Sequence, residues 1–361
     1  MKELKGITVA GPATEKKEKE FFIQWHLTER CNLACIHCYQ DGTRPGEVDL
    51  PAVREAAGEV SDMVKSWAEM YAIPFSPSFN LTGGEPLLLP DIFEILETLK
   101  RQRFEVYLLT NGTLVDAEKA KRLSGLVDGV QISIEGLAHV HDAVRGEGAF
   151  LRACKGAEQL VKSGVFVGLN TTLSRLNVAG LDDIFSLGLS LGVQRVGFSR
   201  LVPYGRGEGL KNDMLTAEQV RDAYARVRGF KDGRIEAATR DPLGTAMEGG
   251  AEDAGDVAFA GCAAGVSGLT LLSDGTLMPC RRLPIAIGNL STDSIREVWT
   301  ESPVLNLLRE RKEYAGKCAG CRRWAVCRGC RAIAYATSAL SGKANFLADD
   351  PQCFLQAHGL T

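Results

Sequence analysis

The chain has 361 residues, 45% of them hydrophobic, and a formal net charge of −3. This length exceeds the range in which a single hydrophobic core keeps growing, so two domains are expected. The nearly neutral charge argues against broad attraction to nucleic acid or to an anionic membrane, and no apolar stretch reaches the ~18 residues of a membrane-spanning helix. The first twenty residues are charged and show no apolar signal core, so we expect a cytoplasmic protein.

Between residue 21 and about residue 201, short β-rich runs alternate with amphipathic helical patterns. Strands are predicted at Phe21–Leu27, Ser78–Leu81, Phe104–Thr110, Val127–Ile134, Phe166–Thr172 and Arg195–Leu201. Helices are predicted near Pro51–Met70, Asp91–Arg101, Ala117–Leu123, Leu151–Lys162 and Leu181–Leu191. This alternation predicts a parallel sheet with right-handed crossovers, and six units fit a closed or partial (β/α)6 barrel. Sites in such folds lie at the C-terminal ends of the strands.

The chain changes character after the sixth predicted strand. A helix near Thr216–Gly229 and the small-residue stretch Gly249–Ala258 indicate a bridge. A hairpin across Ser273–Thr276, a helix near Ser294–Arg311 and a cysteine-dense tail follow. We therefore divide the chain into a lead-in (1–20), a core barrel (21–205), a bridging region (206–257) and a cysteine-rich α+β domain (258–361).

Eleven cysteines in a chain without a signal sequence indicate metal centres, because reducing compartments disfavour disulfides. Cys31, Cys35 and Cys38 follow the first strand at a C-x3-C-x2-C spacing. Three thiolates can hold three irons of a four-iron cube and leave the fourth iron without a protein ligand, unlike clusters built for electron transfer alone. A structural zinc ion binds four ligands. His37 would have to be the fourth, and its position between two of the cysteines is a poor geometry for a closed tetrahedral site. Cys154, in a helical pattern, is predicted to pack as a small apolar residue.

This motif resembles the signature of the radical S-adenosylmethionine (radical SAM) enzymes. In that family the amino and carboxylate groups of SAM bind the vacant iron. The reduced cluster cleaves SAM to methionine and a 5′-deoxyadenosyl radical, which abstracts a substrate hydrogen. The resemblance implies a partial (β/α)6 TIM-like barrel, a [4Fe-4S] cluster on Cys31, Cys35 and Cys38, SAM as cofactor, and a one-electron donor such as flavodoxin or ferredoxin.

The resemblance also assigns SAM contacts at the ends of the following strands. Gly83, Gly84 and Glu85 resemble the family's Gly-Gly-Glu loop, in which closely approaching backbone N–H groups and an acidic acceptor hold the SAM amino group. Packing on adenine is implied for His37, and pairing with the SAM carboxylate for Arg145. Contacts with the ribose or methionine part of SAM are implied for Ser133 and Glu135. Asn111 and Asn170 are candidate hydrogen-bonding residues of the pocket, with a turn as the alternative role of Asn111 before Gly112.

Seven cysteines remain in the C-terminal region: Cys262, Cys280, Cys318, Cys321, Cys327, Cys330 and Cys353. Their spacing resembles the SPASM extension of radical SAM enzymes, which carries two auxiliary [4Fe-4S] clusters. Carried over by position, the nearer cluster takes Cys262, Cys280 and Cys330, and the farther takes Cys318, Cys321, Cys327 and Cys353. Seven ligands for eight positions predict an open or non-cysteine site on the nearer cluster. The alternative is a four-cysteine zinc site of Cys318, Cys321, Cys327 and Cys330, which leaves three cysteines unexplained.

The resemblance covers nearly the whole chain but does not decide the substrate. SPASM proteins commonly modify ribosomally made peptides or protein side chains, and a second branch modifies tetrapyrrole side chains in haem and haem d1 biosynthesis. The tail around Cys327–Ala332 is similar to both. Sulfatase-maturing members place an Asp base after the cysteine equivalent to Cys280, whereas this chain has Arg281 and Arg282, which disfavours that reaction and suggests an anionic substrate group or a solvated pair.

We therefore predict a radical SAM oxidoreductase or maturase, with a peptide favoured over a tetrapyrrole as substrate. About twenty residues precede the first strand, so a peptide would bind directly or through a separate recognition protein. The alternative of another class is a non-enzymatic iron–sulfur scaffold or carrier, or a zinc-binding protein.

Overall fold

The computed structural model describes residues 19–40, 46–248 and 255–355. Ten strands form one sheet in the order β10-β9-β8-β1-β2-β3-β4-β5-β6-β7. The parallel strands that follow one another in the chain are β1 (Lys19–His26), β2 (Phe75–Thr82), β3 (Glu105–Thr110), β4 (Gly129–Ser133), β5 (Val167–Leu173), β6 (Arg195–Arg200) and β7 (Glu236–Thr239). Because β7 and β10 end the sheet without pairing to each other, the barrel is partial.

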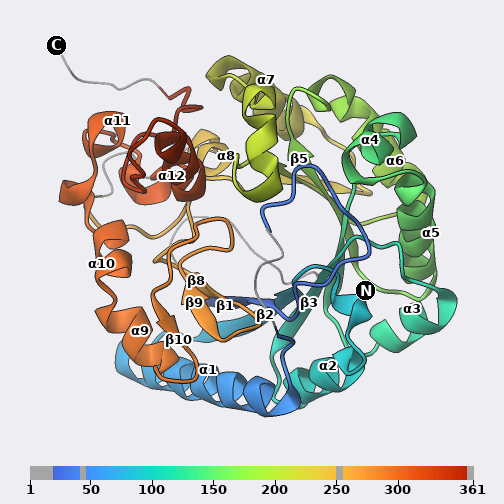
Figure 1. Cartoon of the computed structure of the whole chain (residues 1–361), viewed down its shortest axis with the longest axis horizontal. Helices are drawn as coiled ribbons and strands as arrows, with labels where there is room; N and C mark the ends of the chain where they lie inside the picture. Colours follow the sequence, from blue (N-terminus) through green and yellow to red (C-terminus); the bar gives the residue numbers. More distant parts are fainter. Residues whose placement is uncertain (1–18, 41–45, 249–254, 356–361) are drawn as a thin grey trace.

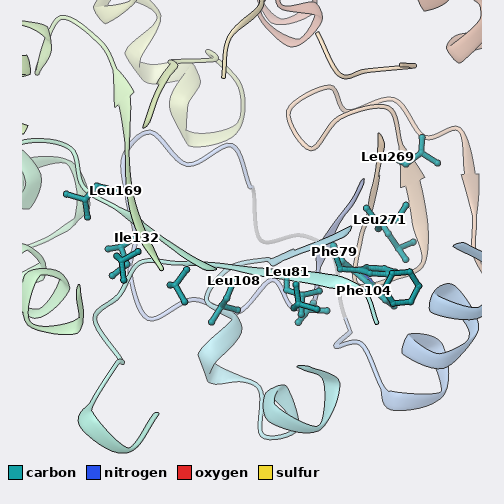
Figure 2. Packing of buried hydrophobic residues seen from close by; sticks show 14 of the residues in the cluster. Phe79, Leu81, Phe104, Leu108, Ile132, Leu169, Leu269 and Leu271 are labelled. Carbon is teal, nitrogen blue, oxygen red and sulfur yellow. The ribbon is translucent and has the colours of Figure 1, made fainter. Parts of the chain in front are cut away.

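Helices connect these strands and lie outside the curved sheet (Figure 1). They are α1 (Leu50–Tyr71), α2 (Ile92–Arg101), α3 (Ala117–Leu123), α4 (Ala138–Arg145), α5 (Ala149–Lys162), α6 (Leu181–Leu191), α7 (Ala217–Gly229) and α8 (Pro242–Met247). Figure 2 shows Phe79, Leu81, Leu108 and Ile132 of three neighbouring strands side by side in the core. All four side chains are fully buried, so this layer fixes the strands whose C-terminal ends carry the site.

The segment predicted as a bridge contributes a seventh parallel strand. β7 pairs with β6 in the register Arg195 to Glu236, and α7 and α8 flank it. Its sequence, Glu-Ala-Ala-Thr, is short and has Thr239 as its one β-branched residue, so pairing with β6 rather than propensity decides its conformation. The lead-in residues 1–18, residues 249–254 of the predicted Gly249–Ala258 stretch, and residues 356–361 lie outside the described residues.

The cysteine-rich region continues the same sheet. β8 (Gly268–Leu271) runs parallel to β1, and β9 (Thr276–Met278) and β10 (Gly288–Asn289) follow antiparallel, which confirms the predicted hairpin. Gly268 is required at this junction, because a Cβ there would lie 2.4 Å from the Phe22 carbonyl oxygen. The sheet thus carries the C-terminal region directly beside the strand that precedes the three-cysteine loop.

One predicted C-terminal helix is two helices. α9 (Ile295–Glu301) ends and α10 (Pro303–Arg309) begins at Ser302, whose hydroxyl caps the Leu305 N–H, because Pro303 cannot continue a helix but suits its first position. α11 (Gly316–Ala319) and α12 (Arg331–Leu340) follow, and Figure 1 shows α12 between α8 and α10. The 3₁₀ helices are Pro86–Leu88, Val178–Gly180, Gly205–Asp213, Arg311–Glu313 and Trp324–Val326.

A membrane-spanning helix is not found among the described residues: none of their helices is both long and apolar enough.

Candidate active site

A cavity of about 350 Å³ opens at the C-terminal ends of the parallel strands. The last residues of β2, β3, β4 and β6 line it: Thr82, Thr110, Ser133 and Arg200. The loop that follows β1 adds the three cysteines at 31, 35 and 38, and the C-terminal region adds Arg281 and Arg282. The cavity also brings together seven residues singled out from the sequence: His37, Gly83, Gly84, Asn111, Ser133, Arg145 and Asn170.

The cysteine loop presents three free thiols to this cavity. Cys35 is buried, whereas Cys31 is exposed and Cys38 is half-buried. The Asn111 side-chain N–H donates to Cys31 Sγ at 3.9 Å, and Arg145 Nη1 donates to Cys35 Sγ at 3.7 Å. Burial raises the pKa of the Cys31 and Cys35 thiols, whereas N–H donors directed at sulfur act in the opposite direction and favour the thiolate, the form that binds metal. The donor set therefore suits an iron–sulfur cluster with three cysteine ligands.

The two glycines after β2 allow the C-terminal end of this strand to lie in close contact with the start of the cysteine loop. A Cβ on Gly83 would lie 2.4 Å from the Thr28 carbonyl oxygen, and one on Gly84 would lie 2.1 Å from that of Arg30. The Gly84 and Glu85 N–H groups donate to those same two carbonyls, at 2.7 and 2.8 Å. These N–H groups are therefore used within the protein, which differs from the predicted donation to a ligand.

Replacing Gly84 by alanine is expected to destabilise the protein by about 1–3 kcal/mol, because the added methyl overlaps backbone that cannot move aside easily. Urea unfolding of the anaerobic holoprotein measures this change. The matched control is Gly58→Ala in α1, where a Cβ meets nothing within 4 Å; it should stabilise by about 0.5–1 kcal/mol. Equal effects of the two substitutions would contradict the close approach.

Glu85 is buried and does not line the cavity. The Thr110 hydroxyl and the Leu87 N–H donate to its Oε1 at 2.7 and 3.1 Å, and the Asn111 N–H donates to Oε2 at 2.8 Å. Burial raises the pKa of Glu85, while these hydrogen bonds lower it. Its carboxylate joins the end of β2 to the end of β3.

Glu135 is also buried, and its carboxylate holds Arg145, which lines the cavity. Arg145 donates through Nε and Nη2 to Glu135 Oε1 at 3.1 and 2.5 Å, and His37 Nε2 lies 3.2 Å from the same oxygen. Burial alone would raise the pKa of Glu135, but the neighbouring Arg145 and His37 bring it well below its ordinary value. The Arg145 guanidinium is therefore held by Glu135 at the edge of the cavity that it lines.

Arg206 is a cavity residue that was missed from the sequence. Two glycines flank it directly after β6. Gly205 has a φ of +61°, its Cβ would lie 2.6 Å from the Tyr39 carbonyl oxygen, and the Gly207 N–H donates to the Cys38 carbonyl at 3.2 Å. A Gly-Arg-Gly segment at a strand end was the available signal, because such loops lie at the site.

The five arginines that line the cavity fall into two groups: Arg145 and Arg200 pair with carboxylates, whereas Arg206, Arg281 and Arg282 form no ion pair among the described residues. The Nε atoms of Arg281 and Arg282 are buried without a hydrogen-bond partner. Arg282 is held by donation from Nη1 to the Arg200 carbonyl at 3.1 Å, and Arg281 lies over the Tyr39 ring at 5.8 Å. Of the two alternatives for Arg281 and Arg282, an anionic substrate group nearby or a solvated pair, their place in the cavity wall favours the first.

Four of the C-terminal cysteines lie together, and two others pack against each other. One small cavity, of about 20 Å³, is lined by Cys318, Cys321, Cys327 and Cys353. Cys330 does not line it; it packs instead with Cys280, and both thiols face Arg282. This grouping disfavours the zinc site that would combine Cys330 with Cys318, Cys321 and Cys327. Nor are any three His, Cys, Asp or Glu side chains of the described ranges arranged to hold a single metal ion.

Comparison with known proteins agrees with this architecture. The model of the radical SAM superfamily matches residues 25–187, and that of SPASM, an iron–sulfur cluster-binding domain, matches residues 262–322. An AdoMet-dependent heme synthase of Methanosarcina barkeri is 33% identical over 92% of this chain and 95% of its own length. Mycofactocin maturase MftC of Mycobacterium ulcerans is 31% identical over 93% of this chain and 88% of its own length.

Solved structures share the fold. SuiB of Streptococcus suis, bound to S-adenosylmethionine, has a TM-score of 0.69 at 17% identity and covers 94% of this chain and 76% of that chain. The enzyme anSMEcpe, solved with AdoMet and a peptide, has a TM-score of 0.66 at 19% identity and covers 88% of this chain and 90% of that chain. The chain is therefore an enzyme of the radical SAM superfamily, with a partial barrel that carries a C-terminal SPASM iron–sulfur domain.

Proposed function

We propose that Cys31, Cys35 and Cys38 hold a [4Fe-4S] cluster on which SAM binds within the cavity. When bound, this cluster and SAM supply the 5′-deoxyadenosyl radical that abstracts a substrate hydrogen. We further propose two auxiliary clusters, one on Cys318, Cys321, Cys327 and Cys353, and one on Cys262, Cys280 and Cys330 with an open or non-cysteine fourth site. A one-electron donor such as flavodoxin or ferredoxin and a cytoplasmic location complete the proposal, which the eleven free cysteines support.

The chain's own residues bind and orient SAM in this proposal. Asn111, Ser133 and Asn170 offer polar side chains at three successive strand ends, and His37 offers a ring beside Cys38. Glu85 and Glu135 act indirectly, because their carboxylates fix the Thr110–Asn111 strand end and the Arg145 guanidinium. Both therefore belong to the proposed site as positioning residues.

The substrate that the geometry supports best is a tetrapyrrole whose carboxylate side chains are modified. The observation that carries this assignment is the cavity wall of Arg281 and Arg282, whose buried Nε donors have no partner. A guanidinium matches a carboxylate in shape and charge. The names of several relatives agree, since AdoMet-dependent heme synthase and pre-heme d1 synthase are 33% and 30% identical over 92% of this chain. We therefore propose the tetrapyrrole ahead of the peptide, the reverse of the order expected from the sequence.

Maturation of a ribosomally made peptide or protein is the second candidate. The 31% identity with mycofactocin maturase over 93% of the chain favours it. The same arginines would then bind an acidic side chain or a C-terminal carboxylate, with or without a separate recognition protein.

Anaerobic titration with iron coproporphyrin III, followed by its absorbance spectrum, tests the tetrapyrrole assignment. Replacing Arg281 by glutamine should weaken binding about 10- to 100-fold, the value of one charge-assisted hydrogen bond. The control is Arg296→Gln, an exposed arginine of α9 whose Nη2 binds the Asp62 carbonyl; binding should not change. Affinity that is the same in all three proteins would reject the assignment, and deoxyadenosine formation coupled to a precursor peptide encoded nearby would favour the second candidate.

A further inference from the structure

Three arginines of the C-terminal half are almost completely buried, and only one has a carboxylate partner. Arg200, Arg328 and Arg331 are each at most 1% exposed. Arg200 is matched by Asp241, with Nε to Oδ2 at 2.8 Å, and by Asp350, with Nη2 to Oδ2 at 2.7 Å. The Arg200 charge is therefore matched inside the protein, and the two carboxylates leave one net negative charge on this three-residue cluster.

Arg328 and Arg331 bind neutral groups instead. Arg328 donates to the backbone carbonyls of Ala260, Ala264 and Cys262. Arg331 donates to the carbonyls of Phe346 and Ala348 at 3.0 and 2.8 Å, and its Nη2 lies 3.9 Å from Cys318 Sγ. The Nε atom of each has no hydrogen-bond partner, and neither guanidinium pairs with a carboxylate within the described ranges.

Both guanidinium groups lie beside the cavity of Cys318, Cys321, Cys327 and Cys353. Arg328 lines that cavity, and Arg331 reaches it through the Cys318 sulfur. Asp350 also lines it, but its carboxylate is paired with Arg200. Two buried arginines thus adjoin the four-cysteine cavity, and neither forms an ion pair among the described residues. A buried charge without a counter-charge is unfavourable, so an anion held by these cysteines would stabilise both arginines.

We propose that Arg328 and Arg331 compensate the negative charge of the iron–sulfur cluster on these four cysteines and raise its reduction potential. The inference rests on the cluster assignment of the proposed function. Reduction adds one negative charge to the cluster, and fixed positive charges in a buried, low-dielectric site stabilise that added charge. Hydrogen bonds and charges around the ligands tune a metal centre in the same way. The farther cluster is thereby suited to accept an electron rather than to deliver one at low potential.

The measurement is the reduction potential of the farther cluster, taken by redox titration followed by electron paramagnetic resonance. The full chain carries Cys31→Ala, Cys35→Ala, Cys38→Ala, Cys262→Ala and Cys280→Ala as background, so that the other two proposed clusters are removed. Arg331→Gln should shift the potential to a more negative value, whereas Arg331→Lys, which keeps the charge, should leave it near that of the background protein. Arg328→Gln should repeat the negative shift.

The matched control is Arg309→Gln. Arg309 is a partly buried arginine of the same region that donates to the Gly265 carbonyl at 2.7 Å and to Asn306, and its removal should not change the potential. Equal shifts for Arg331→Gln and Arg331→Lys, or no shift in either glutamine variant, would overturn the inference. A background protein whose iron and sulfide analysis shows no four-iron cluster would overturn the cluster assignment and the inference together, so the two failures are distinguishable.

Discussion

Cys35→Ala is expected to abolish SAM cleavage, lowering deoxyadenosine formation under dithionite on the order of 10³-fold or more, which corresponds to at least about 4 kcal/mol of barrier. Cys35 is the buried member of the three-cysteine loop, and its sulfur accepts an N–H from Arg145 at 3.7 Å. Two remaining thiolates cannot hold the cluster in the arrangement that leaves one iron open to SAM. Chromatographic quantification of deoxyadenosine and iron analysis measure the loss.

The matched control is Cys154→Ala. Cys154 lies in α5 and packs against the hydrophobic core, as predicted from its helical pattern. Burial raises the pKa of this thiol to about 11, so it remains neutral and unreactive near neutral pH. The variant should keep its iron content and its rate of SAM cleavage. Deoxyadenosine formed by the Cys35 variant at the parent rate would reject the assignment of the site.

Arg200→Met is expected to destabilise the protein by about 3–5 kcal/mol, because it leaves the carboxylates of Asp241 and Asp350 buried without a counter-charge. Arg200 ends β6, Asp241 caps α8, and Asp350 accepts the Cys330 N–H at 2.8 Å. One guanidinium thus joins the barrel to the loop between the two groups of C-terminal cysteines. Denaturant unfolding of the anaerobic holoprotein measures the change.

A second arginine of the same strand supplies the control. Arg195 begins β6 and pairs with Glu236 at 2.8 Å, but the Glu236 side chain is 54% exposed. Ion pairs in water contribute at most about 1 kcal/mol, so Arg195→Met should change the stability by no more than that. Similar losses for the two variants would show that the Arg200 network is not the dominant contact between the two regions.

Short stretches of sequence were sufficient to predict the positions of the six strands and of the cysteine loop. The six predicted strands are all present, because runs of buried β-branched and aromatic residues carry their signal within a few positions. The three cysteines at 31, 35 and 38 likewise lie within one short loop, so their spacing alone identifies them as a set. Strand β7 was missed because its residues carry no such signal and it forms by pairing with β6.

Only the tertiary structure decided which polar groups face the cavity. The Glu85 carboxylate accepts hydrogen bonds from Thr110 and Asn111, and the Arg145 guanidinium pairs with Glu135, so both have partners from other strand ends. Arg281 follows Cys280 in a region that we predicted to be a separate domain. The pairing of β8 with β1 places that region beside the barrel, so that Arg281 lines the cavity. A sequence motif specifies which side chains are available, whereas partners distant in the chain determine which of them remain free to bind a ligand.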